Sequence, residues 1–292
     1  MERGGLVLGG WKYHTVLYCG VVFVVSWSLW YAAGMIDDTT WNISFLFFHL
    51  EIPQSSALTV LGNLVPGLVA VIIVLIVGGK ECSDYFSQLR IPRCSGLLYS
   101  FAVLAPVIVV LLMFLAQEGL KSNTFASLKI ADLARLFLVN ILLAPLWEEL
   151  GWRGFLLPAF STRFRLDKAS LLVACIWAGW HFMLYHSVFR ISVYSYFISA
   201  ATIIPMGVVL AFLYSVSGNK LLLPVLFHGS WNATTSWVTQ IGVRYVAGPV
   251  VLEAVVVWAL AFVAWFWWCR MANRNAPCDE RCLHYTSGGN RL

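Results

Sequence analysis

Two adjacent glutamates followed by an arginine form the first group of residues that could do chemistry. The run reads Glu148-Glu149-Leu150-Gly151-Trp152-Arg153 and lies in an otherwise apolar stretch. On a helix the two carboxylates point about 100° apart, so we expect them to have different partners. Glu149 and Arg153 have the spacing of a helical ion pair. Glu148 then remains free, as a general base requires. In the alternative, both glutamates pair with cations and only hold helices together.

Two further polar groups lie in later apolar stretches of the chain. His181 follows Trp177 by four residues, and His228 precedes Asn232 by four residues. Histidine can transfer protons near neutral pH. The spacing of four places His228 and Asn232 on one helix face, where both could donate hydrogen bonds to an oxyanion. A structural role is also open, because polar side chains often link membrane helices by hydrogen bonds.

The composition places these groups in a membrane. Of the 292 residues, 60% are apolar and only 11% are charged, whereas soluble domains carry about 25% charged residues. Such a chain cannot cover a water-exposed surface, so a soluble enzyme, a disordered chain and a nucleic-acid-binding protein are excluded. The net charge of +5 does not indicate a phosphate-binding patch. Its sign comes from the Lys and Arg residues that flank the membrane spans.

We therefore predict an all-α polytopic membrane protein with about eight transmembrane helices, since a span needs about 20 apolar residues. The predicted spans are 14–33, 57–77, 96–116, 133–153, 169–186, 193–214, 220–237 and 249–269. They form a single helical domain, 1–270. Residues 271–292 follow as a tail.

The distribution of Lys and Arg predicts the orientation of these helices. With the N-terminus inside, fourteen of the nineteen Lys and Arg residues fall in inner segments, as the positive-inside rule requires. Both termini are then cytoplasmic, in a prokaryotic plasma membrane or a eukaryotic endoplasmic reticulum.

Depth in the membrane brings the polar groups together. At 1.5 Å per residue, Glu148 lies roughly 8–14 Å from the inner face, His228 about 12 Å, and His181 and Asn232 about 18 Å. The four side chains can therefore share one layer, around a cavity open to the cytoplasmic side. Ionisable residues at such depth are costly and usually functional.

At these residues the sequence resembles the CPBP family of intramembrane proteases, which includes the type II CAAX prenyl endopeptidases. The family pattern is Glu-Glu-x-x-x-Arg, then aromatic-x-x-x-His, then His-x-x-x-Asn or Asp. This chain matches all three motifs in order, with Trp177 where Phe is more usual. The resemblance covers roughly residues 131–237, and it implies that they form the catalytic core of the helical domain.

The resemblance implies hydrolysis of a peptide bond within the membrane. Glu148 and His181 would activate water, and His228 and Asn232 would stabilise the oxyanion. Glu149 and Arg153 would hold the local structure, although Glu149 could share in catalysis, and Trp177 would form an aromatic wall. A peptide or a prenylated protein would be the substrate, and membrane lipids would be the other partners.

Metal dependence stays open at this point. Glu148, His181 and His228 could bind a catalytic zinc ion, but the sequence has no His-Glu-x-x-His helix, and the ligands would come from three helices. We therefore expect a glutamic endopeptidase without a cofactor, with zinc as the alternative.

Two other classes of function are compatible with intramembrane Glu and His residues. A proton-coupled transporter uses such residues as relays, although here they form one layer and no inverted repeat is present. A non-enzymatic membrane scaffold would tolerate broken motifs, and none is broken here.

Overall fold

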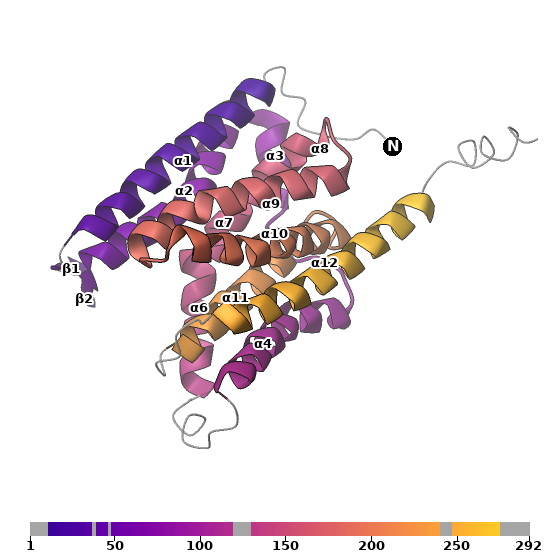
Figure 1. The fold of residues 1–292 in the computed structure, drawn as a ribbon. Coiled ribbons are helices and arrows are strands. Elements are labelled where there is room, and N and C mark those ends of the chain that lie inside the picture. Colours follow the sequence, from indigo (N-terminus) through magenta and orange to yellow (C-terminus); the bar gives the residue numbers. More distant parts are fainter. Residues whose placement is uncertain (1–10, 37–38, 46–47, 119–129, 240–246, 275–292) are drawn as a thin grey trace, which may run out of the picture.

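The computed structural model describes residues 11–36, 39–45, 48–118, 130–239 and 247–274, and these form a helical bundle with one small β-hairpin (Figure 1). The first half contains α1 (Trp11–Met35), β1 (Thr40–Phe45), β2 (Phe48–Pro53), α2 (Gln54–Val77), α3 (Gly79–Ser87) and α4 (Gly96–Glu118). The second half contains α6 (Ile130–Leu143), α7 (Pro145–Gly151), the π-helix η1 (Trp152–Leu156), α8 (Leu157–Ser161), α9 (Leu166–Met183), the π-helix η2 (Leu184–Val188), α10 (Val193–Val216), α11 (Leu222–Thr239) and α12 (Ala247–Arg274).

Five helices in the described part of the chain are long and apolar enough to cross a membrane. They cover His14–Met35, Gln54–Val77, Gly96–Ala116, Leu166–Val188 and Val193–Val216. These agree with five predicted spans, so the chain is a polytopic helical membrane protein. The predicted count of eight is not confirmed. The apolar stretch described in α12 is the shorter Ala254–Trp267, and α11 has 18 residues that include the polar groups of the candidate site.

The predicted fourth span, 133–153, is wrong as a single helix. Helix α6 ends at Leu143, and Ala144 leaves helical geometry with φ −138° and ψ −64°. Helix α7 restarts at Pro145, in the first turn where proline is tolerated because no helical N–H is needed there. After Gly151 the chain widens into η1. This break places Glu148 in the first turn of a short helix.

Two small elements were not predicted. Strands β1 and β2 pair antiparallel, from Thr40 opposite Pro53 to Phe45 opposite Phe48. They lie between α1 and α2, where the sequence predicted only an outer loop. Helix α3 lies at the opposite end of the bundle, close to α8 (Figure 1). Residues 275–292, which include most of the predicted tail, lie outside the described residues.

Helix α10 packs closely against α9 because of one glycine. A Cβ added to Gly207 would lie 2.6 Å from the Cβ of Ala174 and 3.4 Å from Nη2 of Arg153. The missing side chain therefore lets α9 approach and leaves the Gly207 carbonyl within reach of Arg153.

Helix α1 holds the other side of α9. The indole of Trp27 donates to the carbonyl of Trp180 at 2.9 Å, and the rings of Trp30 and Trp180 lie 4.5 Å apart. Trp30 also donates to the Thr59 carbonyl of α2 at 3.1 Å. These contacts fix the turn of α9 that carries His181.

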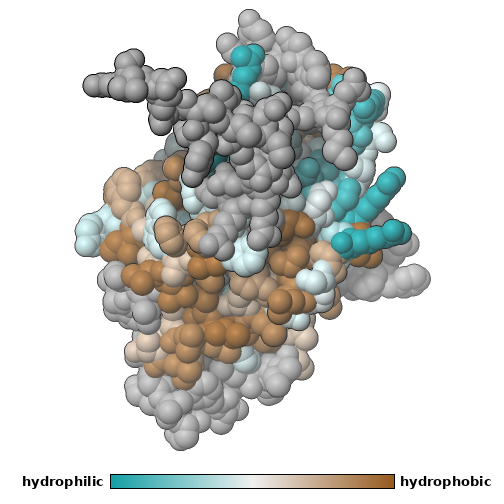
Figure 2. Space-filling model, turned by 90° about the vertical axis from the view of Figure 1, so that its right-hand side faces the viewer, coloured by the Kyte–Doolittle hydropathy of each residue, from teal (hydrophilic) through white to brown (hydrophobic). Residues whose placement is uncertain are grey.

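The outer surface is apolar over most of its height. Exposed large apolar side chains occur along α1, α2, α4, α6 and α12. Figure 2 shows a broad hydrophobic band on one face, with hydrophilic side chains gathered towards one end. A hydrophobic band of this kind suits contact with lipid. The ionisable residues of the candidate site, by contrast, are buried inside the bundle.

Candidate functional site

The two adjacent glutamates in α7 are both buried and, as predicted, have different partners. Glu148 is 3% exposed and Glu149 is 0% exposed. Glu148 faces Trp177 and His181 of α9, whereas Glu149 faces Arg153 of η1 and His228 of α11. The break before Pro145 allows this arrangement, because it places both carboxylates at the start of a new helix inside the bundle.

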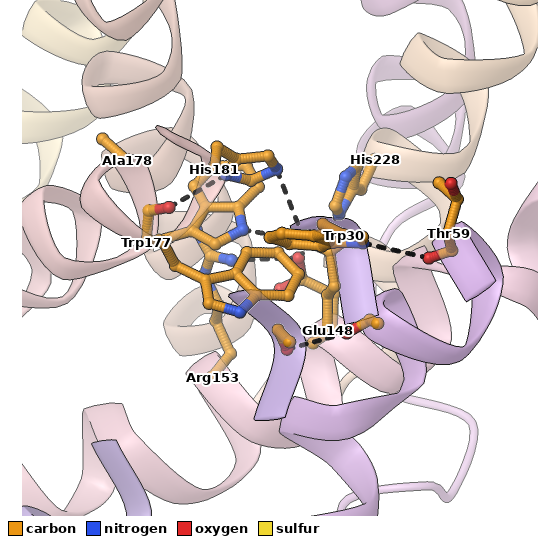
Figure 3. Close-up of polar contacts among 12 residues, drawn as sticks. Trp30, Thr59, Glu148, Arg153, Trp177, Ala178, His181 and His228 are labelled. Carbon is orange, nitrogen blue, oxygen red and sulfur yellow. Dashed lines mark hydrogen bonds and ion pairs between the residues drawn. The ribbon is translucent and has the colours of Figure 1, made fainter. Parts of the chain in front are cut away.

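Glu148 lies against one turn of α9. The indole Nε1 of Trp177 donates to Oε2 of Glu148 at 2.8 Å (Figure 3). Nε2 of His181 lies 3.9 Å from the same oxygen. Nδ1 of His181 lies 2.9 Å from the carbonyl oxygen of Trp177. Because a carbonyl only accepts, Nδ1 carries the proton, and Nε2 of the neutral ring is left as an acceptor facing Glu148.

Glu149 connects two cationic or titratable groups. Its Oε1 accepts from Nη1 of Arg153 at 3.0 Å, which confirms the predicted pair, and it also lies 2.9 Å from Nδ1 of His228. Nη2 of Arg153 donates to the Gly207 carbonyl at 3.2 Å. These contacts thus join four elements, α7, η1, α11 and α10.

Trp177 lies between the two groups. Its ring centroid is 5.1 Å from that of His181 and 5.4 Å from that of His228. The guanidinium carbon of Arg153 lies 4.6 Å from the ring centroid, as a cation–π contact requires. Trp177 therefore contacts members of both groups with its ring, in addition to its hydrogen bond to Glu148.

Asn232 lies one turn beyond His228 on α11 and is half-buried. Its side chain makes no hydrogen bond to the described residues. It therefore remains available as a donor, but it takes no part in the contact network above.

Sequence reasoning missed two contacts in this site. The first is the Glu149–His228 bond, which joins residues 79 apart and has no local signal. The second is the indole N–H of Trp177. A signal for it existed, because tryptophan offers a hydrogen-bond donor where phenylalanine has none.

The indole N–H can be tested by substitution. We expect Trp177→Phe to lower kcat about tenfold with little change in KM, since a hydrogen bond to a charged group contributes about 1.5–3 kcal/mol. The measurement is steady-state hydrolysis of a peptide substrate, with and without a prenyl group. Trp237→Phe, at a buried indole whose Nε1 has no hydrogen bond to any described residue, is the matched control. Equal losses in both variants would contradict a specific role for Trp177.

The fold and the site together define a class: a polytopic membrane protein with buried glutamate–histidine pairs inside its helical bundle. Residues 130–234 match the family model of the type II CAAX prenyl endopeptidases, Rce1-like. The chain is also 24% identical over 241 residues to CAAX prenyl protease 2 of Methanococcus maripaludis, covering 76% of this chain and 84% of that relative. These matches confirm the resemblance drawn from the three motifs: over residues 130–234 the chain is similar to the type II CAAX prenyl endopeptidases.

Proposed function

We propose that this protein is an intramembrane glutamic endopeptidase that hydrolyses a peptide bond near one membrane face. The observation that carries the proposal is the buried pair of Glu148 and His181, with 3.9 Å between Oε2 and Nε2. One water molecule can lie within hydrogen-bonding distance of two groups at that separation. Glu148 then accepts the proton of the attacking water.

His181 is suited to handle a second proton. Its Nδ1–H is committed to the Trp177 carbonyl, so its Nε2 can accept a proton and later donate it to the leaving amine. The same carbonyl bond fixes the plane of the ring. Orientation of this kind is what a general acid–base pair needs.

His228 and Asn232 supply the oxyanion donors in this proposal. Since Nδ1 of His228 donates to Glu149, its Nε2 can donate to an oxyanion only when the ring is protonated. The buried carboxylates of Glu148 and Glu149 and the cations of Arg153 and His228 then balance in charge. Asn232 adds a neutral amide donor one turn along the same helix.

We propose that the reaction needs no metal ion. The alternative uses Glu148, His181 and His228 as zinc ligands. Among the described residues, no group of three or more His, Cys, Asp or Glu side chains converges as a metal site requires. The indole N–H directed at Glu148 is a donor that suits a free carboxylate better than one bound to a cation.

The name of the relative supports a class of substrate. The relative from Methanococcus maripaludis is named a CAAX prenyl protease, so we propose a prenylated protein C-terminus as the substrate of this chain. The apolar outer surface is compatible with a bilayer that also holds the lipid group of such a peptide. We further propose that the end of the bundle with α3 and α8 faces the cytoplasm, where most Lys and Arg residues are predicted.

The test is peptide hydrolysis by the purified protein in detergent. A farnesylated C-terminal peptide and its unmodified counterpart are each incubated with and without a strong zinc chelator. We expect cleavage of the farnesylated peptide at a rate that the chelator does not change. Loss of cleavage on chelation and its return with zinc would instead make Glu148, His181 and His228 metal ligands. A folded preparation that cleaves neither peptide would contradict the protease proposal.

A further inference from the structure

Two buried polar side chains at the end of α3 point at the segment that follows the glutamates. Tyr85 is 1% exposed and Gln88 is 7% exposed. Both lie in the connection between α2 and α4, at the same end of the bundle as α8 (Figure 1). None of the three sequence motifs includes this connection.

Both side chains donate to backbone carbonyls of the α7–η1 segment. The hydroxyl of Tyr85 donates to the Leu150 carbonyl at 3.1 Å. Nε2 of Gln88 donates to the Gly154 carbonyl at 3.1 Å. In an α-helix the Gly154 carbonyl would accept from residue 158, but residue 158 is proline and has no N–H. Gln88 therefore supplies the Gly154 carbonyl with a donor in place of the N–H that residue 158 lacks.

Gln88 is in turn fixed by the second half of the bundle. Its Oε1 accepts from the Tyr214 hydroxyl at 2.8 Å, and its backbone carbonyl accepts from Leu221 at 3.0 Å. Because the Gly154 carbonyl can only accept, these partners fix the orientation of the amide. Tyr214 lies two turns after Gly207 on α10, and Gly207 binds Arg153. Helix α10 thus holds the glutamate segment at two points.

We propose that Tyr85 and Gln88 are positioning residues for this reaction: they fix the backbone of residues 150–154 and so the placement of the Glu148 and Glu149 carboxylates. The inference rests on the proposed function, because it assigns these bonds to the reaction of that same site. The π-helix η1 gives the reason for such a device. Single π-helical turns are rare and occur frequently at functional sites, and this one has backbone carbonyls beside it that accept hydrogen bonds from side chains of another segment.

The first test removes the donors one at a time. We expect Gln88→Leu and Tyr85→Phe each to lower kcat for the farnesylated peptide about tenfold, because misplacement of a catalytic group by 1 Å can cost about a hundredfold. KM should stay within about twofold of wild type. Tyr99→Phe is the matched control, because the Tyr99 hydroxyl donates to the Pro92 carbonyl at 2.9 Å and touches no part of the α7–η1 segment.

The second test restores the missing donor. In the double variant Gln88→Leu/Pro158→Ala, residue 158 regains an N–H that can bond to the Gly154 carbonyl. We expect this variant to recover most of the kcat that Gln88→Leu loses, with Pro158→Ala alone as the reference. A purely structural loss at Gln88 would not be rescued there. Failure of the rescue, wild-type kcat in Gln88→Leu, or an equal loss in Tyr99→Phe would each overturn the proposal.

A third readout does not depend on activity. Amide hydrogen exchange of peptides covering 145–158 should speed up in Gln88→Leu and return towards wild type in the double variant. If the wild-type protein cleaves no peptide, the proposed function fails, while the exchange rates still show whether the two side chains fix this segment. Unchanged exchange in Gln88→Leu would overturn the positioning role by itself.

Discussion

Glu148→Gln is expected to reduce peptide hydrolysis by about a thousandfold, within the range of about 10²–10⁴ that general acid–base catalysis contributes. The substitution keeps the size of the side chain and removes its ability to accept a proton from water. The amide oxygen can still accept from the Trp177 indole, which donates to Glu148 at 2.8 Å in the native site. The loss should therefore fall on kcat while the fold is preserved.

The measurement is cleavage of the farnesylated peptide, with thermal unfolding in the same detergent as the check on folding. Asp84→Asn, an equivalent change at an exposed carboxylate of α3, should retain wild-type activity. Glu148→Gln with more than a tenth of wild-type activity would remove Glu148 from the role of base. Glu149 has a different environment, since its Oε1 is held by both Arg153 and His228.

The sequence predicted those parts of the site that depend on local spacing. The Glu149–Arg153 pair is separated by four residues and forms within one stretch of helix. The different environments of Glu148 and Glu149 followed from their angular separation on a helix. The convergence of Glu148 with His181 followed from their depth, because residues at one depth in a small bundle have few other places to go.

Contacts between distant segments were not predictable in the same way. The Glu149–His228 bond and the Gln88–Tyr214 bond depend on which helices are neighbours, and they join residues 79 and 126 apart. Hydrophobic periodicity carries no information on such pairs. The hydrogen bonds of Tyr85 and Gln88 to the α7–η1 segment were missed for this reason.

The break in the predicted fourth span had a signal in the sequence. Pro145 interrupts the apolar run 133–153, and proline favours the first turn of a helix. The prediction of a single span followed the length of the apolar run and not this proline. The start of helix α3 also had a signal in the sequence, because a Gly-Gly pair favours a turn. In the structure Gly78 and Gly79 form that turn, with positive φ values of 69° and 61°.

Arg153→Met is expected to lower the free energy of unfolding by about 3–5 kcal/mol, the cost of leaving one partner of a buried ion pair without the other. Arg153 and Glu149 are both 0% exposed, so water cannot solvate the carboxylate that loses its cation. Glu149 would keep only His228 as a partner, because its Oε2 has no hydrogen bond to any described residue. The Gly207 carbonyl and the face of Trp177 would also lose their contacts with the guanidinium.

Chemical or thermal unfolding of the detergent-solubilised protein measures this effect, with two comparisons that isolate its cause. Arg165→Met removes an arginine whose side chain is 71% exposed and 3.4 Å from Asp167, and a surface pair of this kind contributes only about 0–1 kcal/mol. The double variant Arg153→Met/Glu149→Gln removes both charges and should regain part of the stability lost in Arg153→Met. Since the neutral amide that replaces Glu149 could not stabilise a protonated His228, that double variant should remain inactive while it recovers stability. Equal destabilisation by Arg153→Met and Arg165→Met would show that burial of the pair is not what makes it important.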